Sequence, residues 1–197
     1  MQMKKLLILL PLIFIGSSAN LSDVTIDKKI YKVSYSQKYE QPLELTYESS
    51  NRPTNVNRGS MDFYVEPGVK TSDNNDYANN IYDKGHLAPA ATFSDNMENL
   101  KLTFSYLNSA LQNQYLNRGE WRLLEEQERK WDDVERLTIQ INVEFKNTNT
   151  VLPTGATVPT GFTKHIFFNN QRIWKCYYFP NVKPTKKWGE HQISCTH

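Results

Sequence analysis

Asp83-Lys84-Gly85-His86 and, further along, Asn117-Arg118-Gly119-Glu120-Trp121 are the two stretches that decide the fold of this chain. The second stretch opens the clearest helical pattern, because large side chains recur at intervals of three or four residues as far as Trp131. Asn117 is a typical N-cap residue, and Glu120 stands at the third helical position, as in a capping box. The pattern therefore predicts a helix that begins at Asn117.

The segments around these stretches contain strand, loop and helix signals. Before the long helix, strand signals occur at Leu43–Tyr47 and Met61–Val65, and a long loop is expected at Glu66–Tyr82. A short helix is then predicted at Asp95–Phe104 and an irregular segment at Tyr106–Leu116. The segments after the long helix predict strands at Leu137–Phe145, Phe162–Phe168 and Ile173–Phe179, the last two joined by a turn at Asn169–Gln171. We expect an α+β fold with a mostly antiparallel sheet and flanking helices.

The N-terminus has the composition of an export signal. Lys4 and Lys5 precede an apolar run from Leu6 to Ile15, and small residues suited to cleavage follow as far as Ala19. The run is shorter than the roughly 20 apolar residues of a spanning helix, so we expect no stable membrane insertion after cleavage. The prediction is a signal peptide at residues 1–19 and a single domain at residues 20–197, secreted or periplasmic.

Charge is unevenly distributed along the chain. The net charge of +2 comes from Lys4 and Lys5, so the predicted mature chain is close to neutral overall. Residues 145–189 nevertheless contain basic side chains and no acidic ones: Lys146, Lys164, Arg172, Lys175, Lys183, Lys186 and Lys187. This segment is a candidate phosphate-facing surface, and a solvated strand face with scattered lysines is an equal alternative.

The two cysteines, Cys176 and Cys195, are expected to pair, because an exported protein meets oxidising conditions. Such a disulfide would hold the C-terminal tail. A zinc site formed by both cysteines with His191 and His197 is the competing interpretation, although its spacing fits no common zinc motif.

His86 and Asn117 are the candidates for catalysis and metal binding. An imidazole can accept a proton from water near neutral pH, and an amide oxygen is a suitable ligand for Mg²⁺. Capping and metal binding compete for the same oxygen of Asn117. Glu125, eight residues further along the helix, could reach a metal-bound water, or could be a solvated surface carboxylate.

Several motifs together resemble the DNA/RNA non-specific endonucleases, a group of ββα-metal nucleases. Residues 83–89, Asp-Lys-Gly-His-Leu-Ala-Pro, resemble D-R-G-H-x-A-P, and Thr103-Phe104-Ser105-Tyr106-Leu107-Asn108 resembles T-F-x-x-S-N. Leu116-Asn117-Arg118-Gly119-Glu120-Trp121 with Leu124-Glu125 resembles L-N-x-G-x-W and L-E. Val158-Pro159-Thr160 with Lys164, and then Pro180-Asn181, resemble the family's closing motifs.

This resemblance implies a sugar-non-specific endonuclease that hydrolyses DNA and RNA to 5′-phosphate and 3′-hydroxyl ends. His86 would be the general base and Asn117 the direct ligand of Mg²⁺, with Mn²⁺ as an alternative ion. Asn108 and Glu125 would support the site, while Arg58 and Lys84 would bind phosphate. A homodimer is one of the assemblies compatible with it.

Three departures from the family pattern bear on this assignment. Lys84 replaces an arginine and would bind phosphate as a point charge. Leu111 replaces a proline, and Asn142-Val143 stand where Gly-Pro is usual. The changes at Lys84 and Leu111 favour an alternative, which is an exported nucleic-acid-binding or structural protein with the same scaffold and little or no turnover.

Overall fold

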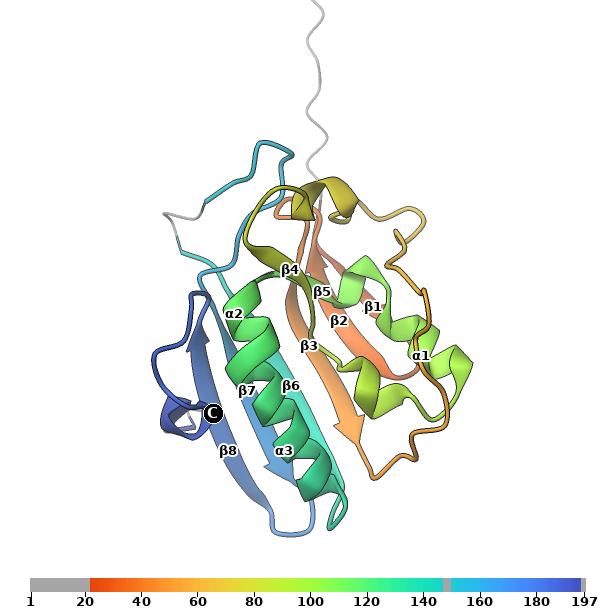
Figure 1. The fold of residues 1–197 in the computed structure, drawn as a ribbon, viewed down its shortest axis with the longest axis vertical. Helices are drawn as coiled ribbons and strands as arrows, with labels where there is room; N and C mark the ends of the chain where they lie inside the picture. Colours follow the sequence, from red (N-terminus) through yellow and green to blue (C-terminus); the bar gives the residue numbers. More distant parts are fainter. Residues whose placement is uncertain (1–21, 147–149, 196–197) are drawn as a thin grey trace, which may run out of the picture.

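The computed structural model describes residues 22–146 and 150–195, so the predicted export signal and His197 lie outside the described residues. A seven-stranded antiparallel sheet has the strand order β1-β2-β3-β6-β7-β8-β9 (Figure 1). Its strands are β1 (Val24–Asp27), β2 (Tyr31–Ser36), β3 (Gln41–Ser49), β6 (Leu137–Glu144), β7 (Gly161–Phe168), β8 (Ile173–Pro180) and β9 (Gln192–Ile193). A second sheet pairs β4 (Tyr82–His86) with β5 (Ser109–Asn113).

One long helix covers part of the large sheet. Helix α3 (Arg122–Asp132) lies across β6 and β7 in Figure 1, and its Trp121 end packs against Phe162 of β7, with ring centroids 5.5 Å apart. The other helical segments are α1 (Met97–Thr103), α2 (Gln114–Leu116), the π-helical turn η4 (Asn117–Trp121) and 3₁₀ turns at Asn74–Tyr77, Ala90–Phe93, Tyr106–Asn108 and Trp188–His191. The architecture is α+β, as the sequence predicts.

Alternation of side chains along the strands places the core between the sheet and α3. In β6 every second residue is buried, beginning with Leu137, because successive side chains of a strand point to opposite faces. Leu45, Ile139 and Ile141 are fully buried in this layer. Among the described residues, no helix is both long and apolar enough to cross a membrane.

The strand predictions after the long helix are confirmed. Strands β6, β7 and β8 form consecutive antiparallel pairs, and the turn between β7 and β8 includes Arg172, which has a φ of 58°. The predicted strand at Leu43–Tyr47 lies within β3, and the predicted helix at Asp95–Phe104 contains α1, with Asn96 as its N-cap.

Two assignments in the middle of the chain are wrong. The predicted strand at Met61–Val65 is reduced to one bridge, in which Tyr64 pairs with Ser105. The segment Tyr106–Leu116, expected to be irregular, contains β5, whose pairing with β4 joins residues far apart in the sequence. Its five residues are all buried, so they lack the alternation that usually marks a strand.

The start of the long helix also differs from the prediction. Helical structure begins at Gln114, and the side chain of Asn113 caps it by accepting a hydrogen bond from the Tyr115 amide at 3.0 Å. Asn117 is therefore not the N-cap. Its predicted capping partner, Glu120, instead accepts a 2.6 Å hydrogen bond from the backbone amide of Trp188. Tertiary contacts thus replace the local capping box.

The predicted disulfide is confirmed, and the zinc site is excluded. Cys176 and Cys195 are bonded, so their sulfurs are not free to bind zinc as thiolates. No group of three or more potential His, Cys, Asp or Glu metal ligands occurs within residues 22–146 and 150–195. The disulfide instead fastens the C-terminal segment that carries Trp188 against β8.

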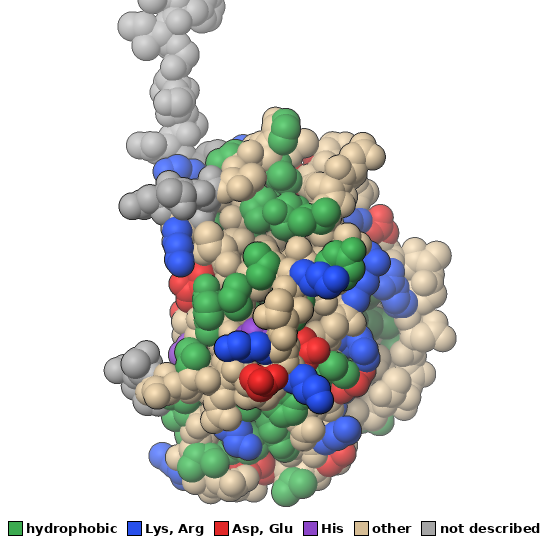
Figure 2. All heavy atoms as spheres, turned by 60° about the vertical axis from the view of Figure 1, so that its left-hand side comes forward, with side chains coloured by type: hydrophobic (Ala, Val, Ile, Leu, Met, Phe, Trp, Pro, Cys, Tyr) green, Lys and Arg blue, Asp and Glu red, His purple; other side chains and the backbone are tan. Residues whose placement is uncertain are grey.

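The predicted basic surface is wrong for Lys164. This side chain is fully buried and pairs with Glu128 of α3, so it cannot contact a phosphate. Position 164 has the strand register of a core residue, which a sequence reading based on charge overlooks. Figure 2 shows one side of the molecule, where lysine and arginine side chains are interspersed with acidic and apolar ones rather than forming a single patch.

Candidate active site

His86 is the last residue of β4, and the strand before it requires glycine. Gly85 lies opposite Ala110 of β5, and a Cβ atom at position 85 would lie 2.4 Å from Oε1 and 2.6 Å from Cβ of Gln112. Such distances are far shorter than a van der Waals contact. Gly85 therefore allows the close approach of the two strands that presents His86 at the strand end.

The imidazole of His86 lies in a partly apolar setting beside a cation. Its ring centroid is 4.8 Å from that of Phe63 and 5.0 Å from that of Phe104. Burial and, secondarily, the charge of Arg58 lower the pKa of His86 to about 3. Its Nε2 atom is buried and has no hydrogen-bond partner among the described residues. His86 is thus neutral at physiological pH, with a nitrogen free to accept a proton.

Asn117 is held by the residue that opens the first motif. Its Nδ2 donates a 2.9 Å hydrogen bond to Oδ2 of Asp83, which also receives two hydrogen bonds from Arg118. This contact directs the amide nitrogen towards Asp83, and no described residue donates to the Oδ1 atom. The amide oxygen is therefore available to a ligand.

Glu125 brings a partly buried carboxyl group to the same region. Burial raises its pKa to about 7, while the charge of Lys164 opposes this shift and that of Glu128 adds to it. Its Oε1 atom is buried and lacks a hydrogen-bond partner in the part of the chain that the structure describes. An unpaired buried carboxyl oxygen is costly, so the site is suited to a bound water or ligand.

These side chains line one continuous groove. Two adjoining hollows, of about 510 and 490 Å³, share Arg58, His86, Asn117 and Arg118 in their walls. The first is also lined by Lys84 and Asp83, and the second by Glu125, Arg122, Glu126 and Arg129. The structure therefore brings together residues from β4, η4, α3 and the loop at Arg58, with an excess of basic groups that suits an anionic ligand.

Comparison with known proteins identifies the family. The sequence model of the DNA/RNA non-specific endonucleases matches residues 11–196. The chain belongs to this family. The fold is also similar to that in a crystal structure described as the EndoG/EndoGI complex, which concerns the mechanism of EndoG inhibition. The TM-score is 0.73 and the sequence identity is 21%. The match covers 86% of this chain and 80% of that one. No curated protein sequence matches the chain. The protein is thus a nuclease, and it has the fold of that family.

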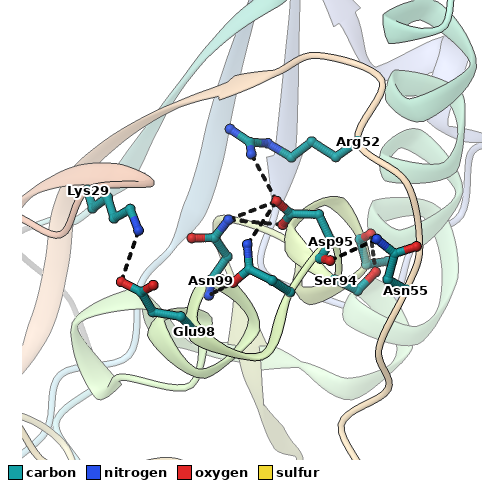
Figure 3. Close-up of polar contacts among 9 residues, drawn as sticks. Lys29, Arg52, Asn55, Ser94, Asp95, Glu98 and Asn99 are labelled. Atoms are coloured by element: carbon teal, nitrogen blue, oxygen red, sulfur yellow. Dashed lines mark hydrogen bonds and ion pairs between the residues drawn. The ribbon is translucent and has the colours of Figure 1, made fainter.

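Arg58 reaches the groove of this nuclease from a loop that is tied down at several points. Figure 3 shows Arg52 and Asn55 on one side and Asp95 and Asn99 on the other. Arg52 pairs with the Asp95 carboxylate at 3.3 Å, and the Asn55 side chain donates to the Asp95 carbonyl at 3.0 Å. These contacts restrain the chain just before Arg58.

Lys84, the residue that replaces the family's arginine, lies at the rim of the groove. Its ammonium group forms a 2.8 Å ion pair with Asp62 and a hydrogen bond with the side chain of Asn74. It also lies 5.5 Å from the ring centroid of Phe63. An anion must therefore compete with Asp62 for this charge.

Asn108 does not line the groove. Its buried side chain accepts a 2.7 Å hydrogen bond from the Ala88 amide and donates to the carbonyls of Ala88 and Thr103 at 2.9 Å each. It therefore braces the chain that follows His86. Its expected support of the site is indirect, through the backbone.

Sequence reasoning missed two groove residues. Asp83 was part of the quoted motif, but its contact with Asn117 depends on β4 approaching η4. Arg129 lines the groove and has a buried Nη1 atom without a hydrogen-bond partner among the described residues. Its position four residues after Glu125, on the same helix face, is the signal that could have revealed it.

Proposed function

We propose that this nuclease is a sugar-non-specific, magnesium-dependent endonuclease that cuts DNA and RNA to leave 5′-phosphate ends. The observation that supports this most strongly is the convergence of His86, Asn117 and Glu125 on one groove, in which His86 and Glu125 each have a buried atom without a hydrogen-bond partner among the described residues. An imidazole, an amide oxygen and a carboxyl group are the parts that hydrolysis of a phosphodiester needs.

His86 acts as the general base. Because burial and Arg58 disfavour its protonation, the imidazole is ready to take a proton from an attacking water at neutral pH. Phe63 and Phe104 restrict the orientation of the ring. The negative charge of a bound phosphate would raise the pKa of His86, which would strengthen the base.

Asn117 fits a hard metal ion, because its free amide oxygen is the type of ligand that Mg²⁺ prefers. Such an ion, or Mn²⁺ in its place, would neutralise the phosphate and stabilise the departing 3′-oxygen. Asp83 fixes the orientation of the amide, and Glu125 would accept a hydrogen bond from a water of the ion's hydration shell.

Basic side chains hold the substrate backbone. Arg58 and Arg129 line the groove, and Lys84 contributes a further charge. Contacts of this kind bind phosphate in any sequence and in either sugar type. Cleavage should therefore weaken as the salt concentration rises and show weak sequence preference.

Cleavage of supercoiled plasmid and of a single-stranded RNA tests the proposal. Each reaction is run with Mg²⁺, with Mn²⁺ and with EDTA, and the product ends are identified by phosphatase and kinase labelling. We expect cleavage of both substrates with either metal and none with EDTA. His86→Ala should lose about 10²–10⁴-fold in rate, the usual contribution of a general base.

The alternative, a nucleic-acid-binding protein with little or no turnover, predicts a different outcome. It would retard both substrates on a gel but leave them intact with every metal. The loss of an arginine at position 84 favours this reading, because lysine lacks the bidentate geometry that arginine offers to phosphate. Lys84→Arg separates the two, since it should increase cleavage in an active enzyme.

Export is also part of the proposal. The Cys176–Cys195 disulfide supports it, because such bonds persist in oxidising compartments. Mass spectrometry of the protein recovered outside the cytoplasm should show a chain that lacks residues 1–19. An intact N-terminus on exported protein would contradict the predicted cleavage.

A further inference from the structure

A lysine is sealed in the core beneath the active-site helix. Lys164 faces the core from β7, and its register neighbours across the sheet are Ile141 and Tyr177, with Leu45 next in the same row. The exposed fraction of its side chain is 0%. An ammonium group in such a layer is strongly disfavoured unless it is paired.

Partners on α3 and β3 satisfy this charge. The Nζ atom of Lys164 lies 2.8 Å from Oε1 of Glu128, whose side chain is 1% exposed. The other carboxylate oxygen of Glu128 accepts a 2.8 Å hydrogen bond from the hydroxyl of Tyr47. Lys164 also lies 4.1 Å from the ring centroid of Trp121, a favourable cation–π distance. The network connects β3 and β7 to α3.

This network lies directly behind Glu125. Glu128 is three residues further along α3, so the two carboxyl groups are neighbours on the helix. The charge of Lys164 favours ionised Glu125, whereas the charge of Glu128 disfavours it.

Other groups also face Glu125. Trp121 and Arg129 approach from the helix, and the hydroxyl of Tyr47 approaches from the sheet. Arg58, His86, Arg118, Arg122 and Glu126 share the groove with it. Among all these groups, Lys164 is the cation that lies in the core, beyond the reach of solvent ions, so its charge is the least screened.

We propose that Lys164 is a positioning residue of the nuclease: its buried ammonium group, held by Glu128, keeps α3 on the sheet and favours the negatively charged form of Glu125 in the groove. The inference rests on the proposed function, because it assigns Glu125 a role as a charged acceptor. A purely structural role would be better served by apolar side chains, since replacing a buried ion pair with packed apolar residues is often neutral or stabilising.

Four variants test this inference through the pH dependence of cleavage between pH 5 and 9. Lys164→Met keeps most of the length of the side chain and removes its charge. The acid limb of the pH profile of kcat/KM should therefore move up by about one pH unit, which is a tenfold loss of rate on that limb. Glu128→Gln removes the opposing charge, so the limb should move down. The double variant should return towards wild type.

Tyr47→Phe is the matched control, because it removes one hydrogen bond from Glu128 without changing any charge. It should lower the urea midpoint and leave the acid limb in place. Carbon-13 NMR titration of the Glu125 carboxyl in metal-free protein should show the same order of shifts without depending on cleavage. If Lys164→Met fails to fold, the downward shift in Glu128→Gln still tests the inference.

The inference is overturned if folded Lys164→Met loses activity equally at every pH, or if Glu128→Gln shifts the limb upwards. His86→Ala, assayed alongside, distinguishes this failure from failure of the proposed function. An active His86→Ala refutes the catalytic proposal, whereas an inactive His86→Ala with unshifted Lys164→Met refutes the role of Lys164 alone.

Discussion

Replacing Asp83 with asparagine should weaken magnesium binding by turning the ligand amide around. In the structure the Asp83 carboxylate can only accept hydrogen bonds, so it selects the orientation in which Asn117 presents Nδ2 to it and Oδ1 to the groove. An amide at position 83 can also donate, and it would then stabilise the reverse orientation. The amide oxygen of Asn117 would be turned away from the metal.

The size of the effect follows from the bond that is lost. A hydrogen bond to a charged group contributes about 1.5–3 kcal/mol, and each 1.4 kcal/mol corresponds to about tenfold in an equilibrium constant. Asp83→Asn should therefore raise the half-saturating Mg²⁺ concentration by about 10–100-fold, the usual range for loss of a group that orients a metal ligand. Calorimetric titration of Mg²⁺ into the protein and the metal dependence of plasmid cleavage both measure it.

Arg118→Met is the matched control, because it removes the ion pair of Asp83 but leaves the contact with Asn117. The Arg118 side chain is 67% exposed, so solvent screens this ion pair and its contribution is small. The half-saturating Mg²⁺ concentration should change by about threefold at most. Equal values in Asp83→Asn and wild type would refute the assignment of Asp83 as the group that orients Asn117.

Three further changes have defined outcomes. Gly85→Ala places a methyl group 2.6 Å from the Cβ of Gln112, so it should lower the free energy of unfolding by about 2 kcal/mol. Urea titration measures this change, and an unchanged midpoint would show that the two strands can move apart without cost. Replacing Cys176 and Cys195 with serine should lower the free energy of unfolding by about 3 kcal/mol, because the disulfide restricts the unfolded chain. Thermal unfolding measures this change, and a stability equal to that of wild type would show that the disulfide does not stabilise the protein in this way. The pKa of His86 falls from 6.5 to about 3 on folding, so between these pH values the unfolded chain binds a proton that the folded chain does not, and stability decreases on acidification. His86→Asn lacks this proton and should lose about 2.5 kcal/mol less than wild type between pH 7 and pH 4.5. Equal losses in the two proteins would place the imidazole in a more solvated setting.

Local patterns in the sequence were sufficient for several features of this protein. The three-to-four-residue spacing up to Trp131 predicted the course of α3, and strand-like segments predicted β6, β7 and β8. His86 and Asn117 were identified from short motifs, and the structure places both in one groove. Such features depend on neighbours within one element, and backbone geometry fixes their period.

Contacts between distant segments decided the rest. Asn117 was expected to cap a helix, but its side chain donates a hydrogen bond to Asp83 of β4, far away in the sequence, and Asn113 caps the helix instead. Lys164 carries a charge, which suggested solvent exposure, yet strand register places it against Glu128 in the core. A side chain's charge, burial and partners depend on which elements pack together, so these properties become visible only when the whole chain is folded.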